Sequence, residues 1–391
     1  MLKKINKNII ALGANSFFTD FSTEMILPLL PIFLERFLHA TKGEIGLIEG
    51  TAELGVALLI ALSGFYSDRL GKRKGLTIIG YGISNLIKPF AFFAQNATMI
   101  ATIRIADRIG KGIRSAPRDA LISHSTPKEA SGFIFGFHKM MDSAGAVAGS
   151  LSAFGLLWFL GESEATFRTV FALSLIPGII AMMILVFFVT DAPFTPSPIR
   201  QFRPKALSAP FYWLVAFQSL FSLFAMNYSF MILKAGDNGM ALAMIPLAYT
   251  LYNLILSLFA IPIGKMADRF GKATLLSVVY IAFSLGALAM TSGTIWGAWL
   301  GFGIYGFFAG GFNSLAKAII SDTAPTELKA TAYGIYYTAI GVATLTSLAV
   351  GGWLWDKVGS TLPFMIASVA ALVLAGILFG MRKRFLIGPS Q

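Results

Sequence analysis

Runs of about 20 apolar residues follow one another along almost the whole of this chain of 391 residues. An α-helix of that length spans the hydrocarbon core of a bilayer. Hydrophobic residues make up 56% of the chain and the mean hydropathy is +0.72, which is more apolar surface than a soluble core can bury. We therefore expect an all-α integral membrane protein whose solvent is lipid.

Charged residues, Gly and Pro separate the apolar runs and indicate about twelve spanning helices. The longest connection is residues 191–209, "DAPFTPSPIRQFRPKALSA", where repeated Pro prevents a continuous helix. This cytoplasmic linker is expected to separate an N-terminal six-helix bundle (1–190) from a C-terminal six-helix bundle (210–391). The expected helices lie at about 8–36, 44–67, 75–95, 97–123, 131–159, 167–190, 210–234, 240–264, 273–292, 294–321, 330–355 and 360–381.

Lys and Arg are concentrated in alternate loops, and the formal net charge is +12. Short loops rich in Lys and Arg face the cytoplasm, so we expect both termini and the linker on the cytoplasmic side of the inner membrane. Because the charge then sets orientation, we expect no nucleic-acid partner. The basic loop residues include Lys3, Lys4, Lys7, Arg69, Lys72, Arg73, Lys74, Arg200, Arg203, Lys205, Lys265, Arg269, Lys272, Arg382, Lys383 and Arg384.

The two halves of the chain repeat one loop. "GFYSDRLGKRK" from Gly64 reappears as "GKMADRFGKAT" from Gly264, with Gly, Asp-Arg and Gly-Lys in register. Both copies resemble the loop signature of the major facilitator superfamily, and together with the helix pattern and linker the resemblance covers the whole chain. It implies a secondary transporter whose two pseudo-symmetric bundles rock around a midplane cavity. The implied conformational gate comprises Gly64, Asp68, Arg69, Gly71, Lys72, Arg73, Asp268 and Arg269.

Two further segments resemble motifs of that family. Arg108-Ile-Gly-Lys-Gly112, with an Arg four residues before a Gly, is similar to the fourth-helix motif of bacterial proton-coupled members. Gly145-Ala-Val-Ala-Gly149 lies where exporters carry a Gly-rich fifth-helix motif, but Ala146 stands in place of the usual Pro. The direction of transport therefore stays open.

The expected fourth helix carries a charged strip, "RIADRIGKGIRSAPRD", at residues 104–119. Residues three or four apart share a helix face. Charges within a membrane helix must face protein or a water-filled cavity, because exposure of each one to lipid costs several kcal/mol. With a local excess of roughly +3, this face predicts a cavity that attracts anions. Its basic residues are Arg104, Arg108, Lys111 and Arg118, with Arg114 near the edge.

Carboxylates and a histidine recur four residues apart on other expected helices. They either neutralise the basic strip and fix helix register, or exchange a proton as the cavity alternates between faces. For proton coupling we predict Asp20, Glu24, Asp142 and His138, with Arg108 as switching partner. Glu49 and Glu53 are expected nearer the outer end of their helix, where they are less informative. We expect no metal site. The alternative is that Asp20, Glu24, His138 and Asp142 together ligate a divalent metal.

The second half offers amide, aromatic and basic groups that suit a polar organic solute. With the basic strip they predict an anionic solute, such as an organic acid or a carboxylate siderophore. The alternatives are multidrug efflux, a divalent-metal (iron-type) carrier, and a receptor or scaffold that keeps the fold without transport. The expected cavity residues of this half are Asn227, Lys234, Tyr252, Asn253, Asn313, Lys317 and Tyr336.

Motifs for enzyme chemistry are weak. Gly301-Phe-Gly-Ile-Tyr-Gly306 matches a dinucleotide pattern but lies in an apolar helix, so close helix packing is the better interpretation, including Gly306 with Gly310. There is no P-loop or hydrolase pattern and no cysteine. We expect a monomeric carrier without enzymatic activity or cofactor. Its partners would be a small-molecule solute, protons and lipid.

Overall fold

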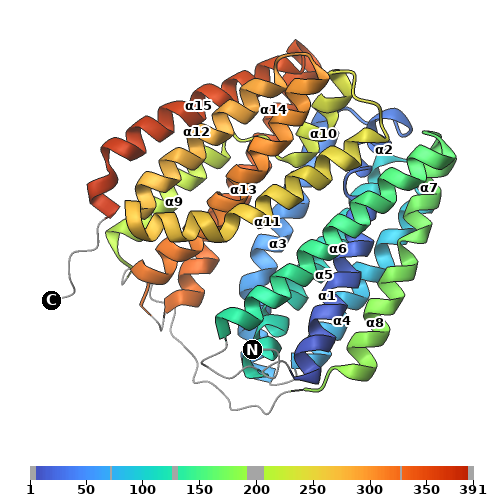
Figure 1. Ribbon diagram of the computed structural model, residues 1–391, viewed down its shortest axis with the longest axis horizontal. Helices are drawn as coiled ribbons and strands as arrows, with labels where there is room; N and C mark the ends of the chain where they lie inside the picture. The colour runs from blue at the N-terminus through green and yellow to red at the C-terminus, as the bar shows by residue number, and fades with distance from the viewer. Residues whose placement is uncertain (1–5, 71–72, 126–130, 192–206, 326–327, 386–391) are drawn as a thin grey trace. The chain divides into compact units, whose positions relative to one another are not determined.

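The computed structural model describes residues 6–70, 73–125, 131–191, 207–325 and 328–385. Within these ranges every regular element is a helix, which confirms the predicted all-α fold (Figure 1). The elements are α1 (Lys7–Ile26), α2 (Leu30–Arg36), α3 (Lys42–Leu70), α4 (Arg73–Ile87), η2 (Lys88–Phe93), α5 (Ala97–His124), α6 (Ser131–Leu160), α7 (Glu164–Leu173), α8 (Leu175–Phe188), α9 (Ala209–Ser222), α10 (Tyr228–Asp237), α11 (Met244–Phe270), α12 (Lys272–Met290), α13 (Ile295–Thr323), α14 (Lys329–Val358), α15 (Thr361–Gly380) and η6 (Arg382–Phe385).

In the described part of the chain, nine helical segments are long and apolar enough to cross a bilayer. The other expected spans correspond to α3, α5 and the α9–α10 pair. Charged side chains are frequent in α5. The helices α9 and α10 are separated at residues 223–227, so neither is long enough by itself to span the bilayer. The expected linker lies mostly outside the described residues.

Several expected single helices are divided in the structure. The first is divided between α1 and α2, where Pro28 and Pro31 lack the amide hydrogen that a continuing helix needs. The sixth is divided at Ser174, three residues before Pro177. The seventh restarts at Asn227, whose side chain accepts hydrogen bonds from the first amides of α10.

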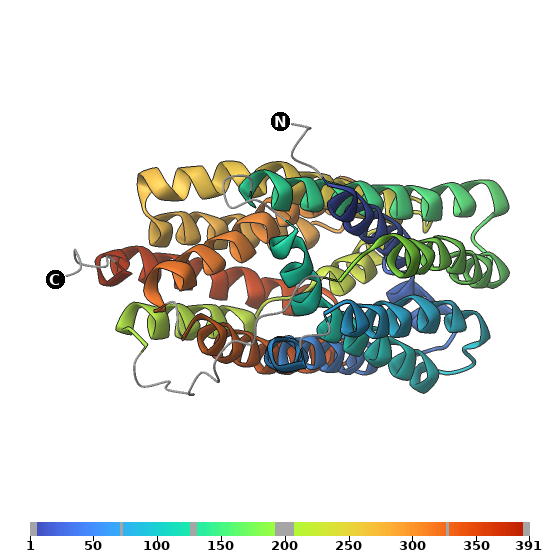
Figure 2. The same cartoon turned by 90° about the horizontal axis from the view of Figure 1, so that it is seen from below.

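The chain divides into two compact units. Unit 1 comprises residues 1–40 and 51–199, and unit 2 comprises residues 41–50 and 200–391. In unit 1, α1 lies along α6 (Figures 1 and 2). A Cβ on Gly145 or Gly149 would lie 2.2 or 2.4 Å from a carbonyl oxygen of α1. These glycines therefore let the two backbones approach closely.

In unit 2, α11 and α13 lie side by side (Figure 1). A Cβ on Gly306 would be 2.6 Å from the Tyr252 carbonyl oxygen, and one on Gly310 would be 2.8 Å from that of Leu256. The predicted packing role of these glycines is confirmed.

The first turn of α3 is capped within unit 2. Thr41 Oγ1 accepts from the Glu44 amide at 3.1 Å, and Glu44 Oε2 accepts from the Thr41 amide at 2.8 Å, which forms a capping box. The Asp356 carboxylate accepts from the amides of Lys42 and Gly43 at 3.0 and 2.8 Å. The amides that a helix start leaves without intrahelical partners are thereby satisfied.

Candidate polar site in the membrane interior

The charged strip of α5 is buried inside unit 1. Arg104, Asp107, Arg108 and Arg114 are each at most 5% exposed, whereas Lys111 is exposed. The Arg114 guanidinium lies over the Tyr81 ring, 4.0 Å from its centroid. Cationic side chains therefore face protein along much of this helix.

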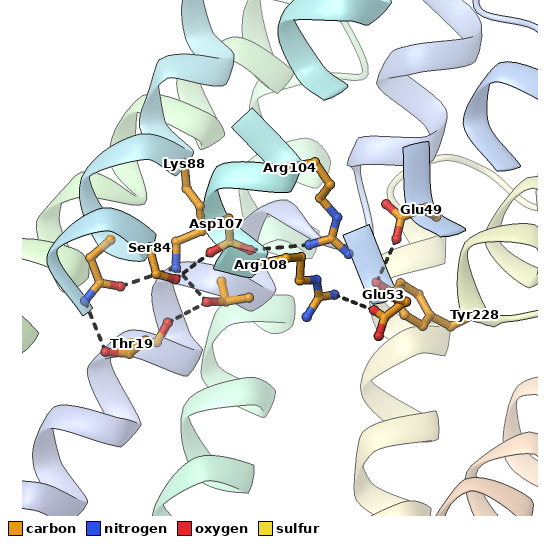
Figure 3. Close-up of polar contacts among 11 residues, drawn as sticks. Thr19, Glu49, Glu53, Ser84, Lys88, Arg104, Asp107, Arg108 and Tyr228 are labelled. Carbon is orange, nitrogen blue, oxygen red and sulfur yellow. Dashed lines mark hydrogen bonds and ion pairs between the residues drawn. The ribbon is translucent and has the colours of Figure 1, made fainter. Parts of the chain in front are cut away.

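Arg108 pairs with Glu53 of α3. Its Nη2 atom lies 3.2 Å from Glu53 Oε1, and the side chains are 6% and 35% exposed (Figure 3). The sequence analysis predicts the carboxylates of α1 and α6 as partners of Arg108, and the structure adds Glu53 of α3 to them. Glu53 is the functional candidate that sequence reasoning passed over.

Asp107 is held on two sides. Ser84 Oγ of α4 donates to Asp107 Oδ1 at 2.5 Å, and Arg104 Nη1 lies 3.5 Å from Asp107 Oδ2 (Figure 3). The Asp107 side chain is 6% exposed. This carboxylate is thus fixed between α4 and its own helix.

Lys88, in η2, adds a buried ammonium group beside these residues (Figure 3). Its Nζ donates to Thr23 Oγ1 at 2.6 Å and to Asn85 Oδ1 at 3.3 Å. It also lies within electrostatic range of Asp107 and Glu24. The signal in the sequence was an ionisable residue inside an expected span, which by itself indicates a functional site.

Two glycines of α5 bring this site together. A Cβ on Gly110 would lie 2.6 Å from the Gly80 carbonyl oxygen of α4, and one on Gly112 would lie 2.5 Å from Leu59 Cβ of α3. Ser63 Oγ donates to the Gly112 carbonyl at 2.8 Å. The glycine four residues after Arg108 therefore lets α3 approach closely enough for Glu53 to reach the guanidinium.

We expect Gly112→Val to lower the free energy of unfolding by about 1–3 kcal/mol, because the added side chain forces α3 away from α5. The measurement is the thermal unfolding of the purified protein in detergent. Gly155→Val on α6 is the matched control, since a Cβ there meets nothing within 4 Å. Equal unfolding temperatures for both variants would contradict close packing at Gly112.

The other acids predicted for coupling lie on α1 and α6. His138 Nδ1 is 3.5 Å from Asp142 Oδ1, and both side chains are largely buried. Asp20 lies within electrostatic range of Asp142, Arg114 and Lys111. Among the described residues, no group of three or more His, Asp or Glu side chains is placed to hold a metal ion, so this arrangement gives the metal-carrier alternative no support.

Several polar residues predicted for the second half take part in local structure. Asn227 caps α10, and Lys234 Nζ donates to Ser360 Oγ at 2.8 Å. Asn313 Nδ2 donates to the Ala309 carbonyl of its own helix at 3.2 Å. The Tyr336 hydroxyl donates to Gln218 Oε1 in the interior.

The remaining three lie on α11 and α13. Tyr252 packs between Tyr249 and Tyr305, with ring centroids 5.3 and 5.5 Å apart. The Asn253 carbonyl accepts from Ser257 Oγ, and Lys317 is exposed.

The two copies of the predicted gate differ in what the structure describes. In the first copy Arg73 is buried, and Gly64 lies within α3. Gly71 and Lys72, and the side chains of Asp68 and Arg69, are not described. In the second copy Asp268 and Arg269 are exposed at the end of α11. Sequence reasoning missed the ion pair between Lys272 at the start of α12 and Asp322 near the end of α13.

Comparison with known proteins gives consistent matches. A family model described as Major Facilitator Superfamily matches residues 12–235 and 212–389. An uncharacterised MFS-type transporter of Methanocaldococcus jannaschii is 31% identical over 385 residues, covering 95% of this chain and 94% of the relative. A mutant of the nucleoside transporter NupG has a TM-score of 0.80 at 13% identity, covering 96% of this chain and 100% of that one. A POT family transporter in complex with 5-aminolevulinic acid has a TM-score of 0.81 at 12% identity, covering 97% and 96%.

Proposed function

Because the chain belongs to the major facilitator superfamily of transporters, we propose that it moves a small, polar, anionic organic solute across the inner membrane by alternating access, coupled to protons. An organic acid or a carboxylate siderophore fits this description. The two termini would lie in the cytoplasm, where the basic loops anchor them. The carrier would act as a monomer, without cofactor or enzymatic chemistry, and would draw on an ion or solute gradient.

The observation that carries the proposal is the concentration of buried cations in unit 1. Arg104, Arg108 and Arg114 are at most 5% exposed, and Lys88 is 4% exposed. Burying charge in a membrane protein is costly, so such groups mark solute or ion pathways. A guanidinium group presents a planar fork that matches a carboxylate, which favours an organic acid over a neutral solute.

Proton coupling is assigned to the acids near this basic face. Asp20, Glu24, Asp142 and His138 lie on α1 and α6, and Arg108 is their proposed switching partner. A carboxylate that gains a proton loses its attraction for a neighbouring cation, which links proton binding to a change in ion pairing. Lys111, Arg114 and Arg118 complete the proposed basic lining of unit 1.

Drug efflux is the second candidate, and one observation in unit 2 favours it. The rings of Tyr228, Tyr249, Tyr252 and Tyr305 follow one another at centroid distances of 5.6, 5.3 and 5.5 Å. The Tyr228 hydroxyl donates at 3.4 Å to Glu49, whose side chain is buried. Aromatic faces beside a carboxylate suit an organic cation.

The test is a thermal-shift screen of the purified protein against monocarboxylates, carboxylate siderophores, aromatic cations and divalent metals, repeated on Arg118→Ala. A ligand present at 100 times its dissociation constant stabilises the folded state by about 2.7 kcal/mol. We expect stabilisation by a carboxylate, reduced in the variant. Stabilisation by cations or metals alone would overturn the proposal and favour efflux or metal transport.

A further inference from the structure

We propose that Glu53 is an internal competitor of the solute: its carboxylate binds the Arg108 guanidinium where a solute carboxylate binds, and a proton on Glu53 releases that guanidinium. This inference rests on the proposed function, because it presupposes an anionic solute. It adds a carboxylate of α3 to the acids proposed for proton coupling on α1 and α6, and it selects that carboxylate because it shares Arg108 with the solute.

The geometry distinguishes Glu53 from Asp107, which also pairs with an arginine of α5. Asp107 is 6% exposed and is fixed by Ser84 and Arg104. Glu53 is 35% exposed and reaches Arg108 across a distance of 3.2 Å from a different helix (Figure 3). Its pair can therefore separate without breaking the α4–α5 contact, and its accessible side lets a proton or a solute approach.

The charges around Glu53 favour an anion at this position. Arg108, Lys111 and Arg104 attract its carboxylate from α5, and Asp107 opposes them. On α3, Glu49 lies one helical turn away. When Glu53 is neutralised by a proton, the three cations of α5 remain, and a second carboxylate is the group that restores the balance.

The exchange balances in charge. One proton converts the Glu53 carboxylate to a carboxylic acid, and one solute carboxylate takes its place on Arg108. Each monocarboxylate therefore enters with one proton, and the net charge around Arg108 is the same before and after. Solute binding should weaken as the pH rises, because ionised Glu53 competes for the same guanidinium.

The test uses isothermal titration calorimetry of purified full-length protein with lactate, gluconate and benzoate, whose carboxyl groups stay ionised between about pH 5.5 and pH 8.5. For wild type we expect affinity to fall by at least about tenfold across this range. In Glu53→Gln the affinity should stay high and independent of pH. Glu164→Gln, the same substitution in the exposed pair with Arg168 at the start of α7, should behave as wild type.

A second measurement needs no variant. Titrations in two buffers of different ionisation enthalpy count protons taken up on binding, and we expect about one per monocarboxylate in wild type. No proton uptake by wild type, or a wild-type pH dependence in Glu53→Gln, would overturn the competitor role while leaving an anion carrier in place. Failure of every monocarboxylate to bind wild type at any pH would instead overturn the proposed function.

Discussion

Arg108→Ala is expected to lower uptake of a carboxylate solute into proteoliposomes by about two orders of magnitude. A hydrogen bond to a charged group contributes about 1.5–3 kcal/mol, and a guanidinium can make two to one carboxylate. Since about 1.4 kcal/mol is a tenfold change in affinity, loss of the fork accounts for a factor of about 100 or more. The measurement is initial uptake under an inward proton gradient.

Two variants show whether the effect belongs to this site. Arg108→Lys keeps the charge but loses the planar fork, so uptake should fall between wild type and Arg108→Ala. Arg168→Ala removes a comparable Arg–Glu pair at the start of α7, where Arg168 lies 2.7 Å from Glu164. That variant should transport normally, and normal uptake by Arg108→Ala would remove the guanidinium from the solute site.

The sequence predicts the helices better than their contacts. Apolar runs mark the spans because each one must satisfy its backbone hydrogen bonds internally within lipid. Spacing along α5 likewise places Arg104 and Arg108 on a shared face. It does not determine how far α1, α3 and α6 are rotated or shifted against that face. In the structure, this arrangement places Glu53 of α3 beside Arg108.

Residue type is an equally weak guide to polar contacts in unit 2. Asn227 and Asn313 are predicted as cavity residues. In the structure the Asn227 side chain caps α10, and the Asn313 side chain donates to the carbonyl four residues earlier. Asn side chains satisfy local backbone groups readily, so local and ligand roles share one sequence pattern. Lys88 shows the opposite situation, because its partners are distant in the sequence. They are Thr23 of α1 and Asp107 of α5, which only the folded structure brings beside η2.

Asp107→Ala is expected to lower the free energy of unfolding by about 3–5 kcal/mol, because it leaves buried cations without their counter-charge. Arg104 lies 3.5 Å from the carboxylate, and Lys88 acts on it electrostatically. Ser84 also loses the acceptor of its hydrogen bond. The measurement is unfolding of the purified protein in detergent by denaturant titration, with wild type alongside.

A charge-balanced double variant separates the loss of counter-charge from a simple loss of packing. Lys88→Met removes the ammonium group while keeping an unbranched side chain. The double variant Asp107→Ala, Lys88→Met should therefore be more stable than the sum of the two single effects predicts. Residues in contact or in one charge network couple by about 0.5–3 kcal/mol in such a cycle. Strict additivity would mean that Lys88 and Asp107 do not balance one another. Coupling would mean that the buried ammonium group of η2 and the Asp107 carboxylate of α5 balance one another in the membrane interior.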